Sequence, residues 1–421
     1  MSNHLSESFF NNFEQSLWQA YRKAITQTRS KKLLFEGCLL GSDINQNFKK
    51  YYFQVYVDHL VRYEDYREYK TNEVKAMESA KIMMLNHTSL EVYELATDNN
   101  ICAEMRYSLL LSQNTHQFFL CPKDEDEMLL WFEKLKQCCI VTHFQNVYKI
   151  QEKIGQGAFA QVYRAIRSAD GQQFAVKIFD KQKVLKNKNH ELHMKAIKKE
   201  IQIMRLFDSP LMLQLHEIYQ TGGNLYMVME LMEGIELFDK IVKKGPFREK
   251  DACIVMKQLL NSVQYLHSLN VIHRDIKPEN IMFTNKKNLE IKIVDFGLAE
   301  FVNDPEVLFK RSGTPGYVGP EILRDRPYDT QSDVFSTGVI MYQILTGCTP
   351  FFGDNLDEVV LKNISAQVCY DFREINIEVS NQGLDLMKQM LKQNPDARYS
   401  ASKAMQHLWI TKFTDIKQES T

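Results

Sequence analysis

The sequence has little net charge and lacks the patterns that mark several classes of protein. Its 421 residues carry 52 Lys and Arg against 53 Asp and Glu, so we expect no nucleic-acid partner and no global attraction to anionic membranes. Eight cysteines are scattered without a Cys-x-x-Cys pair, which argues against zinc and a disulfide framework and favours a reducing compartment. No apolar run approaches the roughly 20 residues that a membrane span needs. The N-terminus lacks a basic-then-apolar signal segment, so we expect a cytoplasmic protein.

The chain is longer than one hydrophobic core usually supports, so we expect two or three domains. In residues 1–30, apolar side chains recur at a spacing of three to four residues, which predicts a helix. Its members are Phe10, Phe13, Leu17, Tyr21 and Ile25, with Phe9 and Trp18 widening the face. Such a helix either packs onto its own protein or contacts a partner or a membrane.

Residues 31–140 carry the pattern of an antiparallel sheet followed by one helix. Short runs rich in β-branched and aromatic residues are separated by polar turns. The predicted strands are 33–41, 48–55, 60–63, 81–86, 107–112 and 117–121, and the helix after Asp124 has Met128, Trp131, Leu135 and Cys138 on one face. A strand barrel closed by a C-terminal helix with a central Trp resembles a pleckstrin-homology domain.

The positions that decide lipid binding in that family differ here. Phosphoinositide-binding members carry a Lys before the Glu-Gly of the first strand and a basic-x-Arg pair at the second, whereas this sequence has Phe35, and Lys49 followed by Tyr51. Lys49 and Lys50 remain, and two lysines on a strand edge are usually solvated. We therefore expect weak, salt-sensitive binding to phosphoinositide membranes without headgroup selectivity. The protein would then be cytoplasmic and bind membranes only peripherally. A protein-contact or autoinhibitory role ranks ahead of lipid binding.

The stretch from Val271 to Gly297 holds three polar side chains whose spacing suits transfer of a phosphoryl group. Asp275 can accept a hydroxyl proton, while Asn280 and Asp295 can hold magnesium. Between apolar, strand-like runs and in this order, they closely match the catalytic and metal loops of a eukaryotic protein kinase. The alternative is a polar hairpin beside a core strand.

Further motifs extend the resemblance to a protein kinase over residues 148–413. The glycine-rich run 154–162 would let backbone amides approach nucleotide phosphates. Lys177, on an apolar strand, needs an anionic partner, for which Glu200 is the candidate. The predicted parts are an N-lobe at 148–231, a C-lobe at 232–413 and a tail at 414–421.

The resemblance also implies which residues bind ATP. Met229 would be the gatekeeper beside adenine, and Met232 its likeliest backbone contact in the hinge. The third glycine of the family's loop is Ala160 here. The implied ATP-binding residues are Ile154, Gly155, Gln156, Gly157, Ala158, Phe159, Ala160, Val162, Ala175, Lys177, Glu200, Met229, Glu230, Met232 and Glu236.

Catalytic roles follow from the same resemblance. Asp275 would position the substrate hydroxyl and accept its proton. Lys277 would contact the transferring phosphate, and it marks the serine/threonine class. Asn280 and Asp295 would hold Mg²⁺, and Lys177 would contact the α and β phosphates.

Other residues match structural positions of the family. Glu321 and Arg398 are expected to form an ion pair. Asp333 is expected to cap backbone amides of the catalytic loop. His273 and Phe296 are expected to be packing residues rather than catalytic ones.

Two runs, 234–239 and 312–317, resemble the calcium/calmodulin-dependent kinase group most. The kinase-like region ends near Phe413, which leaves no room for that group's autoinhibitory and calmodulin-binding helix. Calmodulin is therefore not an expected partner, and we expect residues 1–140 to restrain the kinase instead.

Substrate preference is implied by acidic positions. Glu236 and Glu279 lie where related kinases bind an arginine three residues before the acceptor, and carboxylates recognise a guanidinium through charge-assisted hydrogen bonds. Gln343 stands where some members carry a third acid. Leu298 resembles members that prefer serine over threonine.

The activation segment lacks the usual phosphorylation site. Arg274 belongs to kinases that often hold a phosphate there, but the phosphate-carrying position is Lys310, and no Ser, Thr or Tyr stands between it and the Asp-Phe-Gly run. Ser312 and Thr314 remain as phosphate acceptors, but Thr314 is expected to hydrogen-bond Asp275 and Lys277. We therefore expect activity without phosphorylation of this segment.

These features predict a multidomain α+β protein, in which an N-terminal β-barrel with a C-terminal helix precedes a bilobal protein kinase fold. We expect a serine/threonine kinase that uses ATP and Mg²⁺ to phosphorylate proteins. The alternatives are a catalytically silent kinase-like scaffold, and a membrane or protein adaptor in which the kinase activity is secondary.

Overall fold

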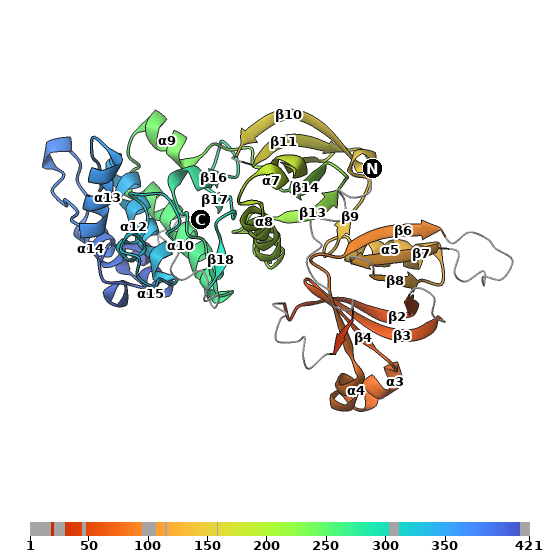
Figure 1. Ribbon diagram of the computed structural model, residues 1–421. Helices are drawn as coiled ribbons and strands as arrows, with labels where there is room; N and C mark the ends of the chain where they lie inside the picture. Colours follow the sequence, from red (N-terminus) through yellow and green to blue (C-terminus); the bar gives the residue numbers. More distant parts are fainter. Residues whose placement is uncertain are drawn as a thin grey trace, which may run out of the picture. The chain divides into compact units, whose positions relative to one another are not determined.

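The computed structural model describes residues 18–20, 30–43, 48–94, 107–113, 116–157, 159–302 and 311–412. The chain forms two compact units (Figure 1): unit 1 comprises Met1–Leu206 and Gln214–Leu231, and unit 2 comprises Phe207–Leu213 and Met232–Thr421. Most of the predicted N-terminal helix, Ala158 and the tail at 414–421 lie outside the described residues. Among the described residues, no helix is long and apolar enough to cross a membrane.

The N-terminal region, residues 18–139 of unit 1, is a series of antiparallel strands with helices attached (Figure 1). Its described strands follow the order β1-β5-β4-β3-β2-β8-β7-β6. The strands are β1 Gln19–Ala20, β2 Leu33–Asp43, β3 Lys49–Tyr56, β4 His59–Tyr63, β5 Lys81–Met84, β6 Ser89–Glu94, β7 Tyr107–Gln113 and β8 His116–Cys121. The helices are α3 Tyr66–Thr71, α4 Glu73–Ser79 and α5 Glu125–Leu135.

Aromatic side chains fill the core of this region. Phe53 and Trp131 are fully buried, with ring centroids 6.3 Å apart in an edge-to-face arrangement. Gly37 lies under the indole, where a Cβ atom would approach Trp131 to 3.0 Å. Asp124 begins α5 by accepting a hydrogen bond from the amide of Glu127, as acids at that position predicted.

The structure changes two expectations about this region. Gln19–Ala20 form a strand on β5 rather than part of a helix, because pairing with an available strand edge outweighs local periodicity. Among the described strands, β1 pairs with β5, and β6 pairs with β7 and β9. These described strands form no closed barrel, and neither the predicted barrel nor the pleckstrin-homology resemblance is confirmed.

A two-residue strand joins this sheet to the next one. β9, Ile140–Val141, pairs in parallel with β6 on one side and with β13, Leu215–Gln220, on the other. The short helix α6, Phe144–Val147, follows it, and Phe144 stacks on Tyr226 with ring centroids 4.1 Å apart. All described strands of unit 1 thus belong to one 14-stranded sheet.

The rest of unit 1 is an antiparallel sheet with the order β13-β14-β12-β11-β10. The helix that follows β12 and α7 places Met194, Ile197, Ile201 and Met204 on a buried face, at the spacing of an amphipathic helix. The elements are β10 Tyr148–Gln156, β11 Ala160–Arg167, β12 Gln173–Asp180, α7 Lys181–Lys186, α8 His190–Arg205 and β14 Asn224–Met229.

Unit 2 is mainly helical, with α12 buried along nearly its whole length. Helices α10 and α14 pack against it, and α15 packs against α10 (Figure 1). The main helices are α9 Leu237–Lys244, α10 Glu249–Ser268, α11 Pro320–Leu323, α12 Gln331–Thr346, α13 Leu356–Ser365, α14 Asn381–Met390, α15 Ala401–Met405 and α16 Leu408–Lys412. Short strands flank the central loops: β15 Val271–Ile272, β16 Ile281–Phe283, β17 Ile291–Ile293 and β18 Glu300–Phe301.

Candidate active site

The glycine-rich loop connects β10 and β11 in unit 1. Gly155 pairs with Val162, and the amide of Gly157 donates to the carbonyl of Ala160 at 2.8 Å. A Cβ atom at Gly155 or Gly157 would meet its nearest neighbour at 3.5 or 3.7 Å, which is ordinary contact. Internal packing therefore does not require either glycine, whereas close approach of a phosphate to the backbone would.

Three other predicted loop residues have different surroundings. The ring of Phe159 lies 4.0 Å from that of His193 on α8. Gln156 accepts a hydrogen bond from Lys153, and Ile154 is exposed.

Lys177 and Glu200 form the ion pair that the sequence predicted. Lys177 lies on β12 between Val162 of β11 and Met227 of β14. Its Nζ atom is 2.6 Å from Oε1 of Glu200 on α8, and the two side chains are 17% and 4% exposed. Removing either partner would leave the other charge largely buried, so the pair depends on α8 staying in place.

The residues predicted to surround adenine are divided between the two units. Ala175 and Met229 are paired across β12 and β14, and both are buried. Glu230 follows at the end of β14, whereas Met232 and Glu236 belong to unit 2.

Asp275 is the centre of a hydrogen-bonded cluster in unit 2. Its Oδ2 atom lies 2.8 Å from Nζ of Lys277 and accepts a hydrogen bond from Nδ2 of Asn280 at 3.0 Å. Its Oδ1 atom accepts the hydroxyl of Thr314 at 2.6 Å, to which Lys277 also donates at 2.9 Å. Both carboxylate oxygens are thus fixed in direction, and the predicted bonds of Thr314 are confirmed.

Asp333 on α12 holds the backbone of this loop. Its Oδ2 atom accepts the amide of His273 at 2.9 Å, and its Oδ1 atom accepts that of Arg274 at 3.0 Å. Arg274 has a φ of +67°, which is unfavourable for a non-glycine residue, so these two bonds stabilise a strained turn. Burial lowers the pKa of His273, and its neutral ring packs on Phe296 at 5.0 Å. The predicted structural roles of these residues are confirmed.

Asn280 and Asp295 are brought together by a short strand pair. Asn280 precedes β16 and its carbonyl accepts the amide of Val294, next to Asp295, at 2.9 Å. The Asp295 side chain accepts the amide of Gly297 at 3.3 Å. Among the described residues, no cluster of three or more His, Cys, Asp or Glu could hold a metal. This donor set fits Mg²⁺, which is usually held by one or two protein oxygens together with substrate phosphates.

The guanidinium of Arg274 already has partners. Its Nε atom donates to the carbonyl of Leu298 at 2.6 Å, and its Nη1 atom donates to the hydroxyl of Tyr328 at 3.1 Å. The sequence analysis missed Tyr328, because no local spacing links it to Arg274. Lys310, the position of the missing phosphorylation site, lies outside the described residues.

Glu236 and Glu279 belong to a group of like charges in unit 2. Burial raises the pKa of Glu236, and the charges of Asp239 and Glu279 raise it further. The Oε2 atom of Glu279 is buried without a hydrogen-bond partner among the described residues. Asp239 was not predicted, although an acid three residues after Glu236 at the start of α9 is a readable signal. Gln343 is buried and accepts the hydroxyl of Tyr317 at 3.0 Å.

Glu321 and Arg398 form the second predicted ion pair. Both are buried, and two hydrogen bonds of 2.9 and 3.0 Å join the guanidinium to the carboxylate. Arg398 also donates to the carbonyl of Gln331 at the start of α12. The pair thus ties α11 to the loop before α15.

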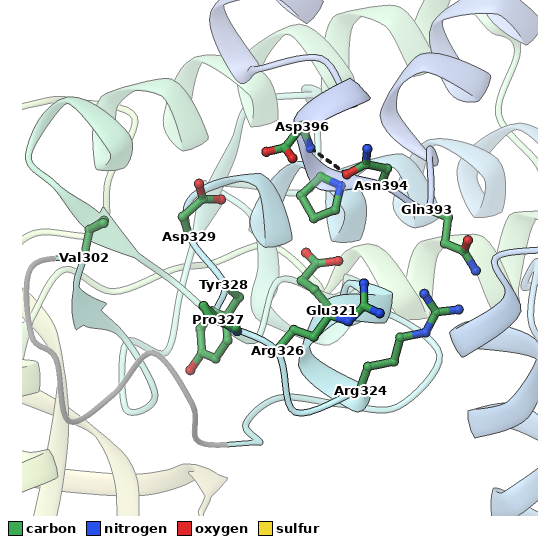
Figure 2. A pocket seen from close by; sticks show the side chains of 11 residues that line it. Val302, Glu321, Arg324, Arg326, Pro327, Tyr328, Asp329, Gln393, Asn394 and Asp396 are labelled. Atoms are coloured by element: carbon green, nitrogen blue, oxygen red, sulfur yellow. Dashed lines mark hydrogen bonds between the residues drawn. The ribbon is translucent and has the colours of Figure 1, made fainter.

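A pocket of about 530 Å³ lies beside this pair (Figure 2). Its lining combines positive and negative side chains, among them Arg324, Arg326, Asp329 and Asp396 (Figure 2). None of its lining residues comes from the catalytic loop, so this pocket is not part of the candidate active site.

Comparison with known proteins agrees with this geometry. A family model described as "Protein kinase domain" matches residues 148–410, more than half of the chain. Myosin light chain kinase A of Dictyostelium discoideum is 37% identical over 272 residues, which cover 64% of this chain and 90% of that protein. Calcium-dependent protein kinase 5 of Plasmodium falciparum is 40% identical over 270 residues, 64% of this chain and 46% of that protein. Calcium/calmodulin-dependent protein kinase type 1B of Rattus norvegicus is 36% identical over 267 residues, which cover 63% of this chain and 76% of that protein. The chain belongs to the protein kinase family and is a protein serine/threonine kinase.

Proposed function

We propose that this kinase uses ATP and Mg²⁺ to phosphorylate proteins that carry an arginine three residues before the acceptor serine or threonine. The cluster around Asp275 carries the proposal. A carboxylate oriented by Lys277, Asn280 and Thr314 can align a substrate hydroxyl and take its proton. Lys277 supplies a positive charge beside the same oxygen, where the transferred phosphoryl group needs one.

The remaining groups bind and orient the nucleotide. Bound Mg²⁺ neutralises the charge that develops on the phosphates. Asn280 and Asp295 hold the metal, and Lys177, kept in position by Glu200, contacts the phosphates. The backbone of the glycine-rich loop contacts them as well, which accounts for glycines that packing alone does not require.

Selectivity for arginine rests on the acidic group formed by Glu236, Asp239 and Glu279. Burial raises the pKa of Glu236, and the charges of Asp239 and Glu279 raise it further. A guanidinium placed beside these carboxylates would relieve their repulsion. Two carboxylates converging on one guanidinium give directional, charge-assisted recognition. Leu298 is exposed and supports the preference for serine.

We further propose that residues 31–140 form a regulatory, pleckstrin-homology-like module of a cytoplasmic enzyme. Contact with anionic membranes is weak, because Lys49 is already paired with Glu64 and few other basic residues stand at that strand edge. Peripheral membrane binding is therefore secondary to regulation.

The rival reading is a kinase-shaped scaffold without activity. It would not require an intact pair between Lys177 and Glu200 together with an intact cluster around Asp275. The presence of both favours an enzyme over a scaffold.

Phosphate transfer to synthetic peptides tests the proposal. The purified full chain with Mg²⁺ and labelled ATP should phosphorylate a serine peptide with arginine at the third position before the acceptor. The same peptide with alanine there should react at least about tenfold more slowly, because a charge-assisted contact is lost. The Lys177→Met variant should be inactive with both. Equal rates for the two peptides would refute the arginine preference, and an inactive wild-type chain would refute the catalytic assignment.

A further inference from the structure

Arg205, the last residue of α8, is a buried cation that connects this helix to the N-terminal region. Its side chain is 7% exposed. Its Nη2 atom donates to the carbonyl of Cys139 at 2.6 Å, and its Nη1 atom donates to Oδ1 of Asn86 at 3.2 Å. Both acceptors are neutral, and among the described residues Arg205 has no carboxylate partner.

Burial of this guanidinium makes the two bonds important. Because Arg205 is buried, its charge is largely removed from water, and this loss of hydration lowers the pKa of Arg205. Hydrogen bonds from a charged donor are stronger than neutral ones and replace part of the lost hydration. The position of this cation at the C-terminus of a helix is also favourable. Arg205 is therefore stable in this position only while Asn86 and Cys139 remain beside it.

A second buried contact lies at the adjoining strands. The Nζ atom of Lys136, just after α5, is 3.0 Å from Oε1 of Glu217 on β13. Glu217 also accepts the hydroxyls of Tyr148 and Tyr219, each at 2.8 Å. Burial acts to raise the pKa of Glu217, but Lys136 and the hydrogen bonds hold it below its usual value. Together with β9, this contact fixes the N-terminal region against the sheet that carries Lys177.

His87, in the N-terminal region next to Asn86, adds no positive charge to this contact. Burial, Lys198 and Arg205 lower the pKa of His87 to about 3. The imidazole is therefore neutral near pH 7 and does not repel Lys198 and Arg205.

Glu200 stands on the same helix, five residues before Arg205, or about 7.5 Å along its axis. Because a packed helix moves as a rigid body, the position of Arg205 affects that of Glu200. We propose that Arg205 is a positioning residue for phosphoryl transfer, whose bonds to Asn86 and Cys139 hold α8 so that Glu200 stays paired with Lys177. The N-terminal region thereby supports the kinase, which is opposite to the restraint expected from the sequence. This inference rests on the proposed function and specifies its regulation.

An asparagine pair in the full chain provides the test. Asn86→Ala removes a hydrogen-bond acceptor of Arg205 without changing the amino-acid sequence of α8. The matched control is Asn72→Ala, which removes the N-cap of α4, where Asn72 accepts the amide of Lys75 at 3.1 Å. We expect Asn86→Ala to lower kcat about fivefold or more with an unchanged KM for the peptide, and Asn72→Ala to leave kcat unchanged. Arg205→Lys, which keeps the charge but loses the planar fork, should resemble Asn86→Ala.

A double-mutant cycle identifies the route of the effect. If Asn86 acts through Glu200, Asn86→Ala should cause no further loss of kcat in a Glu200→Gln background. Additive losses would overturn the proposal, as would an unchanged kcat in the single variant. A merely structural role would lower the melting temperature without producing this non-additivity.

Amide hydrogen exchange of the nucleotide-free protein gives a readout that does not depend on activity. Asn86→Ala should increase exchange across residues 190–205, whereas Asn72→Ala should increase it only around α4. Unchanged exchange in α8 would overturn the proposal. If the wild-type chain transfers no phosphate, the proposed function fails, but faster exchange in α8 would still support the anchoring role of Arg205 and unchanged exchange would still refute it.

Discussion

The N-terminal region and the kinase domain use their polar side chains differently. In the kinase domain, buried polar residues such as Asp333 and Arg398 connect segments that are far apart in the sequence. In the N-terminal region the core is aromatic and aliphatic, and an ion pair such as Lys49–Glu64 lies at the surface, with side chains 57% and 32% exposed. The kinase domain therefore depends on particular polar residues with defined partners, whereas the N-terminal region depends mainly on apolar packing and on the surfaces that it presents. The N-terminal region also contains buried polar side chains, among them Asp58, His59 and Arg62. Asp58 and His59 pair with each other as chain neighbours, whereas Asn86 and Lys136 contact the kinase domain.

The largest effect is expected at the catalytic carboxylate. Asp275→Asn should lower kcat by a factor of about 10² to 10⁴, because the proton acceptor is lost, while the melting temperature changes little. Asp371→Asn removes an exposed carboxylate that is paired only with Arg373 among the described residues, and it should leave kcat unchanged. Steady-state rates with a serine peptide measure both. An active Asp275→Asn enzyme would contradict the catalytic role of this carboxylate and its difference from the exposed carboxylate of Asp371.

The next largest effect separates buried ion pairs from exposed ones. Arg398→Met should destabilise the folded state by about 3–5 kcal/mol, because Glu321 would be left as an uncompensated buried charge. Arg311→Met is its matched control, since Arg311 also makes two hydrogen bonds to a carboxylate, that of Asp325, but at the surface. The control should have little effect. Thermal and urea unfolding measure the difference, and equal losses for the two variants would contradict it.

Substrate recognition should show an intermediate effect that depends on pH. The Glu236→Gln variant should raise KM for the arginine peptide about tenfold, which corresponds to ~1.4 kcal/mol. Because the pKa of Glu236 is raised, binding of a cationic peptide favours the ionised form and releases a proton. KM for that peptide should therefore rise as pH falls through the raised pKa, at a higher pH than for an ordinary glutamate. The alanine peptide serves as the control, and a pH profile identical for both peptides would exclude this role of Glu236.

A small effect is expected for the basic strand edge of the N-terminal region. Lys49→Ala should change the stability by less than about 1 kcal/mol, as usual for an exposed ion pair. Sedimentation with phosphoinositide vesicles should show weak binding that disappears at high salt and does not depend on the headgroup. Tight, headgroup-selective binding would show that the N-terminal region, like the kinase domain, depends on particular polar residues.

No effect is expected from removing phosphate from the activation segment. Arg274 is held by Leu298 and Tyr328, so the catalytic loop does not depend on a phosphate to fix this side chain. Protein co-expressed with a phosphatase and verified by mass spectrometry should retain full activity. A silent dephosphorylated enzyme that recovers only when Ser312 gains a phosphate would show the prediction to be wrong.

Much of the kinase domain could be predicted because its chemistry demands particular residues. The pair Lys177–Glu200 could be identified because a charge in an apolar stretch must have a partner, whereas Glu321–Arg398 was expected from its match to structural positions of the family. The loop contacts of Asp333 followed from the family resemblance. Tyr328 could not be predicted, because a tyrosine hydroxyl can serve many partners and no spacing selects Arg274.

The N-terminal region was less predictable because its fold depends on long-range pairing. Gln19–Ala20 carry a helical pattern, but they pair with β5. The helices α3 and α4 and the strand β6 were missed, since short amphipathic segments have weak periodicity. Arg205 did carry a signal: it stands in the apolar run 203–207, as Lys177 does in its own strand. Its acceptors, however, include a backbone carbonyl, which leaves no mark in the sequence.

The strand β9 has a practical consequence for work with fragments of this protein. A fragment that begins at residue 148 would lack Ile140 and Val141, which cover Ile218 and Tyr219 on β13. It would expose an unpaired sheet edge, and exposed edges promote self-association between molecules. The same cut would leave Arg205 without both of its acceptors. Such a fragment is expected to aggregate on storage, so its low activity would combine loss of soluble enzyme with loss of the contacts that hold α8.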